Sequence, residues 1–139
     1  MPSSRNCSHR TIFVAALDAI DREAHGALEK LRRYAGLYDS VMRNDRLCLC
    51  GMLAAEYSTL PAPMQAELRR FFDANEVWLA AVLEDGRLAG ELAFRGTPKQ
   101  RARVVLGALE GAMLVARAYD EGRRFQSAAK QVLADLSAV

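Results

Sequence analysis

Residues 97–119 constrain the fold most, because they predict one helix with two apolar sides. The helix start is well defined, with a capping hydroxyl at Thr97, Pro98 at the first helical position and Gln100 at N3. At about 100° per residue, one side carries Ala102, Val105, Leu109, Met113 and Ala116. The other side carries small residues: Val104, Gly107, Ala108, Gly111, Val115 and Ala118. Both sides need burial, so this helix must lie inside a bundle.

The side built of small residues predicts an interface between two copies of the chain. Only a narrow strip with Arg103, Glu110 and Arg117 is charged. Few other helices remain in so small a domain to cover both apolar sides, so we assign one side to a second copy. The alternative is a central core helix that its own chain covers completely.

The other segments also have helical periodicity and predict an all-α bundle. We expect helices over 11–35, over 45–59 and over 64–84, with a short segment at 37–42 and a last helix after Gly122. Asp85 and Gly86 predict a left-handed stop for the third of these helices. We predict a flexible N-terminal segment at 1–10 and one helical domain at 11–139.

The composition indicates a cytoplasmic protein with neither a membrane segment nor a nucleic-acid surface. The 139 residues are 51% hydrophobic and 26% charged, and the net charge of +2 is spread along the chain without a basic stripe. The three cysteines, an odd number, do not form a disulfide framework and suit a reducing compartment. No apolar run reaches membrane-spanning length.

Two polar residues fall on predicted core faces among aromatic residues. Glu56 lies on the same side of its helix as Met52, and Asn75 lies between Phe71 and Trp78. Such groups either satisfy partners within the fold or orient a ligand in an apolar pocket. In the second case, Tyr57, Phe71 and Trp78 are the wall and lid of the pocket.

A series of short motifs adds a family resemblance. They are FVAAL at 13–17, Cys48-Leu49 followed by Glu56, FFDANEVWL at 71–79 and LEGAML at 109–114. In this order and spacing they resemble the regulatory domain of TetR/AcrR-type transcriptional repressors. The resemblance covers nearly the whole chain after Arg10.

The resemblance implies an all-helical, dimeric effector-binding domain whose last two long helices form a four-helix bundle with their symmetry mates. The implied interface residues are Val104, Gly107, Ala108, Gly111, Val115, Ala118, Phe125, Val132 and Leu136. Family members carry an N-terminal helix-turn-helix domain, and only 1–10 precedes the matching region here. The sequence therefore predicts no direct nucleic-acid binding by this chain.

The resemblance also implies a small apolar or electrophilic ligand. The candidate ligand-binding residues are Cys48, Met52, Glu56, Tyr57, Phe71, Asn75, Trp78, Leu109 and Met113. In some family members a cysteine at the place of Cys48 is implicated in sensing electrophiles or oxidants, a role that needs a lowered thiol pKa. The alternative is an inert, buried thiol. Cys48 and Cys50 lie about 200° apart on a helix, so we expect no metal and no cofactor.

Two other classes of function stay open at this point. One is a structural or interaction protein that forms heterodimers and has no ligand pocket; a cavity lined by Met52, Phe71 and Trp78 would distinguish the two. The other is an enzyme, for which the sequence supplies no nucleophile with its base and no phosphate loop. We therefore predict a regulator without catalytic activity.

Overall fold

The structure, a computed structural model, describes residues 2–43 and 56–138, with side chains described for 13–42 and 56–138. The described elements are helices, in the order α1 (Pro2–Glu23), α2 (Ala27–Arg43), the 3-10 turn η1 (Tyr57–Thr59), α4 (Ala62–Leu88), α5 (Pro98–Ala118) and α6 (Gly122–Leu136). An isolated antiparallel bridge joins Leu92 to Ser137. The predicted all-α fold is confirmed.

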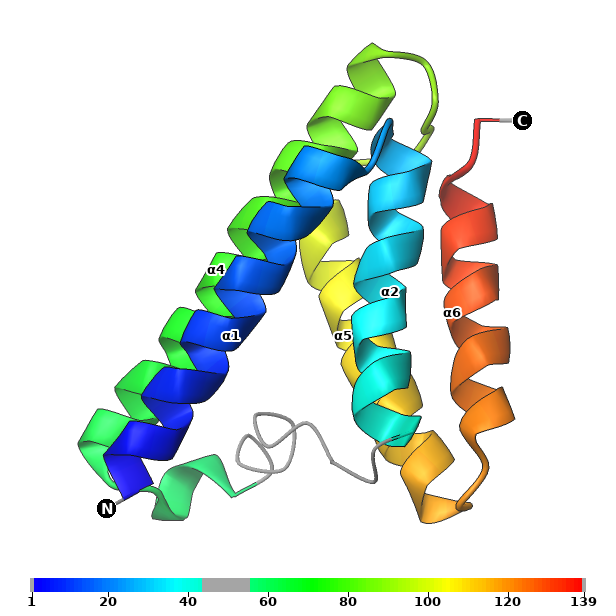
Figure 1. The fold of residues 1–139 in the computed structure, drawn as a ribbon. Coiled ribbons are helices and arrows are strands. Elements are labelled where there is room, and N and C mark those ends of the chain that lie inside the picture. The colour runs from blue at the N-terminus through cyan, green and yellow to red at the C-terminus, as the bar shows by residue number, and fades with distance from the viewer. Residues whose placement is uncertain (1, 44–55, 139) are drawn as a thin grey trace.

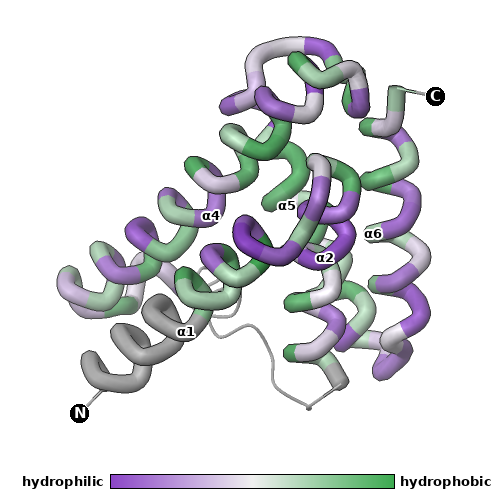
Figure 2. Tube along the Cα trace, turned by 45° about the horizontal axis from the view of Figure 1, so that its top comes forward, coloured by the Kyte–Doolittle hydropathy of each residue, from purple (hydrophilic) through white to green (hydrophobic). Residues whose placement is uncertain are grey.

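The helices form a bundle in which α2 is in contact with each of the other four long helices (Figure 1). α1 and α4 lie side by side and run in the same direction, α2 returns in front of α5, and α6 runs antiparallel to α2. Along α4 the hydropathy changes with each turn, as expected for a helix with one buried side (Figure 2). The largest fully buried side chains are Tyr34, Phe125, Leu31, Leu79, Leu83, Leu109, Met113, Val105 and Asn75.

The predicted helix over 11–35 is wrong in one respect, because the chain turns between Glu23 and Ala27 and forms two helices. Gly26 adopts a left-handed conformation with φ 86°, and the Ala27 amide donates to Glu91 Oε2 at 2.8 Å, which supplies an acceptor for the first turn of α2. Apolar spacing continues across the turn because both helices bury one side. Periodicity alone therefore could not reveal the change of direction.

Of the other predicted helix boundaries, the structure confirms some and corrects others. α1 begins at Pro2, well before the predicted start, and α2 continues through the short segment expected at 37–42. The capping box at Thr97 is present, with Gln100 N donating to Thr97 Oγ1 at 3.1 Å, and α6 begins at Gly122, one residue before the expected start. The helix expected over 45–59 lies mostly outside the described residues. Its last part, Tyr57–Thr59, is a 3-10 turn.

The predicted helix stop at Gly86 is also wrong, because α4 ends at Leu88, and the left-handed residue that follows its cap is Gly90, with φ 77°. Gly86 is buried inside the helix, where an added Cβ would lie 2.5 Å from Leu92 Cδ1 and 2.6 Å from Ala27 Cβ. The glycine thus permits close packing rather than a turn. We call the contacts of Gly26, Ala27, Gly86, Glu91 and Leu92 the junction, since they join the α1–α2 turn to the α4–α5 connection.

In the described part of the chain, no helix combines the length and apolar character needed to cross a membrane.

Candidate functional site

A series of hydrogen bonds crosses the interior of the bundle and joins α2, α4 and α5. The hydroxyls of Tyr34 and Tyr38 lie 3.3 Å apart on α2. Tyr34 donates to Asn75 Oδ1 at 2.8 Å, and Tyr38 donates to Glu110 Oε1 at 2.9 Å. Asn75 Nδ2 donates in turn to the carbonyl of Phe71 at 2.8 Å. We call Tyr34, Tyr38, Asn75 and Glu110 the polar chain.

Burial makes the polar chain both costly and well ordered. Tyr34 is 0%, Asn75 1% and Glu110 8% exposed. A polar group removed from water costs free energy unless it is hydrogen-bonded, and a hydrogen bond is electrostatically stronger in a medium of low dielectric constant. Apolar side chains at these positions would pack without needing hydrogen-bond partners. The side chains of the polar chain do need such partners, and the hydrogen bonds fix the orientation of each side chain.

Aromatic rings surround the polar chain. Phe13 of α1 makes an edge contact with Phe71 of α4, with ring centroids 5.1 Å apart, and Tyr34 stacks on Trp78 at 5.3 Å with an interplanar angle of 22°. Edge and stacked pairs of this kind stabilise a fold beyond the area they bury. The aromatic cluster comprises Phe13, Tyr34, Tyr38, Phe71, Phe72, Trp78 and Phe125.

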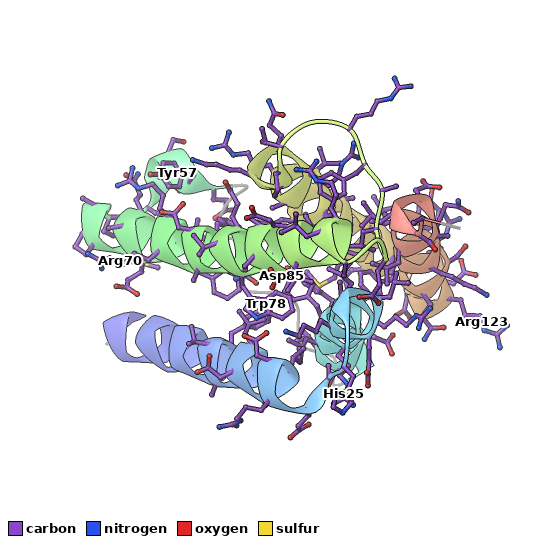
Figure 3. The ribbon with its side chains drawn as sticks, turned by 90° about the horizontal axis from the view of Figure 1, so that it is seen from above. His25, Tyr57, Arg70, Trp78, Asp85 and Arg123 are labelled. Atoms are coloured by element: carbon purple, nitrogen blue, oxygen red, sulfur yellow. The ribbon has the colours of Figure 1, made fainter. Side chains whose placement is uncertain are left out.

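Trp78 connects this interior to α1. Its side chain lies in the space between α4 and α1 (Figure 3), and its Nε1 donates to Asp21 Oδ2 at 3.0 Å. The other carboxylate oxygen of Asp21 forms an ion pair with Lys30 Nζ of α2 at 3.3 Å. The last part of α1 is therefore bonded to Trp78, and Trp78 in turn stacks on Tyr34 of the polar chain.

The structure brings together most of the predicted pocket residues that it describes. Phe71, Asn75, Leu109 and Met113 are buried in the core, while Trp78 and Tyr57 are half-buried against it. Glu56 is exposed, so the prediction that it lies on a core face is wrong for the described structure. Cys48 and Met52 lie outside the described residues.

Three members of the polar chain were missed by sequence reasoning. The predicted charged strip of the fourth helix included Glu110, but this carboxylate is buried and bonded to Tyr38. Tyr34 and Tyr38 are spaced by one helical turn. We expected one helix to end at residue 35 and a separate segment at 37–42, so the two tyrosines fell in different predicted elements. The available clue was a pair of tyrosines on one helix face, together with a glutamate among small apolar residues of another helix.

The second apolar side of α5 is not covered by the part of its own chain that the structure describes. We call Val104, Gly107, Ala108, Gly111, Val115 and Ala118 the outer face of α5. Val104 is 55% and Val115 is 52% exposed. A Cβ added at Gly107 or Gly111 would meet nothing within 4 Å. The alternative of a central core helix covered on both sides therefore does not hold for the described residues.

The interface residues predicted on α6 are revised. Phe125 and Leu136 are 1% and 3% exposed and pack in the core of their own protomer. Their side chains are thus not available to a second copy. Val132 is half-buried beside them.

The arrangement offers binding chemistry with fixed hydroxyl, amide and carboxylate groups among aromatic rings, as small-molecule sites commonly do. Among the described side chains, no group of three or more His, Cys, Asp and Glu residues has a metal-binding arrangement.

Comparisons with known proteins agree with this fold. Residues 27–132 match the family described as tetracyclin repressor-like, C-terminal domain. A TetR-family transcriptional regulator from Agrobacterium tumefaciens is 30% identical, with a TM-score of 0.92 over 96% of this chain and 71% of that chain. No curated protein matches the sequence.

Two more distant structures share the fold. A TetR transcriptional regulator from Legionella pneumophila is 21% identical, with a TM-score of 0.83 over 95% of this chain and 70% of that one. NemR from E. coli, in its reduced form, is 20% identical, with a TM-score of 0.78 over 96% and 69%. With its matching family and this helical bundle, the chain belongs to the tetracyclin repressor-like C-terminal domains of TetR-type transcriptional regulators.

Proposed function

We propose that this chain is the effector-binding and dimerisation domain of a TetR-type regulator, and that its effector is a small apolar or electrophilic compound bound among α1, α2, α4 and α5. The observation that carries the proposal is the polar chain, which places hydroxyl, amide and carboxylate groups inside an aromatic interior. We assign it no catalytic role.

The polar chain also supplies a means of response. An effector that accepts from Tyr38 or donates to Glu110 competes with a bond between α2 and α5. Tyr34 stacks on Trp78, and Trp78 binds Asp21 of α1, so a shift of α2 changes the support of α1. In the family that the motifs resemble, this helix follows the DNA-reading module. Binding then signals only if the effector prefers one arrangement of these helices over another.

The outer face of α5 supports the second half of the proposal, which is homodimerisation. Glycines and alanines let a second helix approach closely, and the exposed Val104 and Val115 supply apolar area on either side of them. We expect α5 and the adjoining side of α6 around Val132 to pack against their symmetry mates. A heterodimer with a different chain would use the same residues.

Trp78 provides the experiment, because it is the only tryptophan of the chain and it stacks on Tyr34. We would titrate the protein with phenol, benzaldehyde and cyclohexanone, and record tryptophan emission together with the thermal midpoint. Saturable quenching with a raised midpoint, weakened at least tenfold in Tyr38→Phe, supports an effector site in the interior. Emission that stays unchanged with every compound, or equal binding in Tyr38→Phe, would contradict it.

The role of Cys48 as a thiol sensor stays a prediction. If the thiol is activated, mild N-ethylmaleimide treatment should label Cys48 before Cys50, which mass spectrometry of peptides resolves. Equal labelling of the two cysteines would count against a sensor.

A further inference from the structure

A concave surface lies between α2 and α6, where Phe125 of the aromatic cluster forms part of its lining. This groove has a volume of about 560 Å³, within the range of small-molecule sites. Its floor is apolar or small, and its rim carries charged and polar side chains. The lining residues used below are Leu28, Arg32, Gly36, Phe125, Lys130 and Leu133.

The register of the two helices places both cations of the groove in its middle. α2 and α6 run antiparallel (Figure 1), and Gln126 Nε2 donates to Asp39 Oδ1 at 3.1 Å. About two turns away along each helix, Arg32 of α2 comes level with Leu133 of α6. Lys130 lies about one turn from that level, so an anion between the helices can contact both cations.

The charges of the groove favour an anionic ligand. The ion pairs formed among the described residues involve neither Arg32 nor Lys130. Asp39 is the acidic residue of the lining, and its carboxylate accepts from Gln126 about one turn beyond Lys130. Among the lining residues, the middle of the groove therefore has two exposed cations, and the one carboxylate, of Asp39, lies toward one end.

The floor favours an apolar group attached to that anion. Gly36 has no side chain to cover the floor, and an added Cβ would meet nothing within 4 Å. Phe125 and Leu133 lie beside it from α6, and Leu28 lies at the end away from Asp39. A hydrocarbon chain in this position removes apolar surface from water while its charged end stays at the rim.

We propose that the groove between α2 and α6 is a second ligand site, distinct from the interior effector site, and that it binds amphiphilic anions such as a fatty carboxylate. The carboxylate lies between Arg32 and Lys130, since a guanidinium forms paired hydrogen bonds with a carboxylate. The hydrocarbon chain lies over the floor at Gly36.

The groove stays open when the outer face of α5 is covered. In Figure 1 α2 lies in front of α5, and in the view from above α2 and α5 lie on opposite sides of the bundle (Figure 3). Lys130 and Leu133 line the groove from α6, whereas Val132 does not. The site therefore does not depend on the proposed dimer, and it shares no residue of the polar chain.

The test is a calorimetric titration of the full chain with sodium decanoate below its micelle concentration, with decyltrimethylammonium as the probe of opposite charge. We expect saturable binding of decanoate and at least tenfold weaker binding of the cation. Trp78 emission should stay unchanged, because this side chain lies between α4 and α1.

Matched variants locate the site. A Cβ at position 36 meets nothing within 4 Å, so Gly36→Leu places its side chain over the floor and should weaken decanoate binding at least tenfold, whereas Gly36→Ala should retain it. The double variant Arg32→Gln, Lys130→Gln should also weaken it at least tenfold. Arg123→Gln removes the same type of charge from the outside of α6 and should leave binding unchanged (Figure 3).

Several results would overturn the proposal. Decanoate binding that Gly36→Leu does not weaken places the ligand elsewhere, and a simultaneous change of Trp78 emission places it in the interior. Equal affinity for decyltrimethylammonium excludes selection by charge. No binding to the parent chain excludes the site, and none of these results bears on binding of uncharged compounds among the aromatic residues.

Discussion

Gly86 and Gly111 are buried and half-buried glycines of neighbouring helices, yet their surroundings differ completely. At Gly86 a Cβ would lie 2.5 Å from Leu92 and 2.6 Å from Ala27, inside the junction. At Gly111 a Cβ would meet no atom within 4 Å. The first glycine is required by the protomer itself. The second has no packing role in the protomer, which is consistent with a close approach from outside.

The two regions differ in their hydrogen bonds as well. At the junction, Glu91 Oε2 accepts from the Ala27 amide, and the backbone of Ala93 donates to the Leu136 carbonyl at 2.9 Å. The α1–α2 turn, the α4–α5 connection and the end of α6 are thus held together at one end of the bundle. The outer face of α5 presents apolar and small side chains, which offer no such bonds and gain free energy only by burial. The junction therefore supports the fold, and the outer face remains available for association.

The largest effect is expected for Gly86→Val. The new side chain has no space between Leu92 and Ala27, so either the α4–α5 connection or the start of α2 must move. We expect a loss of about 3 kcal/mol or more in the free energy of unfolding, measured by urea denaturation. Gly107→Ala is the control, and its protomer should be unchanged or slightly more stable because alanine favours helix. A Gly86→Val protein as stable as the parent would contradict the packing described here.

Gly111→Leu tests the other side of the comparison. The side chain enters open space in the protomer, so the helical circular dichroism should be retained, while a closely packed second helix would be displaced. We expect the dimer dissociation constant to rise at least about 100-fold, which corresponds to about 2.7 kcal/mol, in sedimentation velocity runs. Precipitation of the exposed variant would also agree with an interface.

A soluble dimer of unchanged affinity would refute the assignment of this face. Gly111→Ala is the matched control, since one methyl group separates helices far less than a leucine does. We expect it to form dimers with only slightly weaker affinity than the parent protein.

Much of the fold was predictable because the responsible signals are local. The capping box at Thr97 and the apolar spacing of α4, α5 and α6 depend on residues within a few turns of one another. The turn at Gly26 and the continuation of α4 through Gly86 depend on Glu91 and Leu92, which are distant in sequence from the α1–α2 turn. In the sequence, a glycine that ends a helix cannot be distinguished from a glycine that lets a neighbouring side chain pack closely against the helix.

The candidate site was predictable only in part, for a similar reason. Asn75 attracted attention because it interrupts an aromatic stripe, and the structure bonds it to Tyr34. Glu110 appeared to be a surface charge because Arg103 and Arg117 share its heptad position. Its burial depends on the packing of α5 against α2, where the Tyr38 hydroxyl supplies a donor. The partner of a buried carboxylate is a tertiary property that periodicity does not contain.

Tyr38→Phe tests the interior that lies opposite the outer face of α5. The substitution removes the donor to Glu110 and the neighbour of the Tyr34 hydroxyl while it keeps the ring. Removing the donor of a buried acceptor costs about 1 to 3 kcal/mol, so we expect a loss of about 2 kcal/mol in urea denaturation. Tyr119→Phe, at a residue that is 62% exposed, is the control and should change stability by less than about 0.5 kcal/mol. Equal effects of the two variants would mean that the polar chain contributes nothing to stability.

The smallest effect is expected at the edge of the junction, where Glu29 receives a hydrogen bond from the His25 amide at 2.8 Å and one from Arg33 at 3.0 Å. The His25 amide, followed by Arg33, lowers the pKa of Glu29 below its ordinary value of 4.5. Because the folded pKa is the lower one, the carboxylate stabilises the fold above the unfolded pKa, and this contribution is lost as the pH falls through the folded pKa. Glu29→Gln should therefore be slightly less stable than the parent at pH 7 and equal to it after acidification below the folded pKa. Thermal midpoints of both proteins between pH 7 and pH 3 measure this difference, and a difference that grows on acidification would reverse the sign of the assigned interaction.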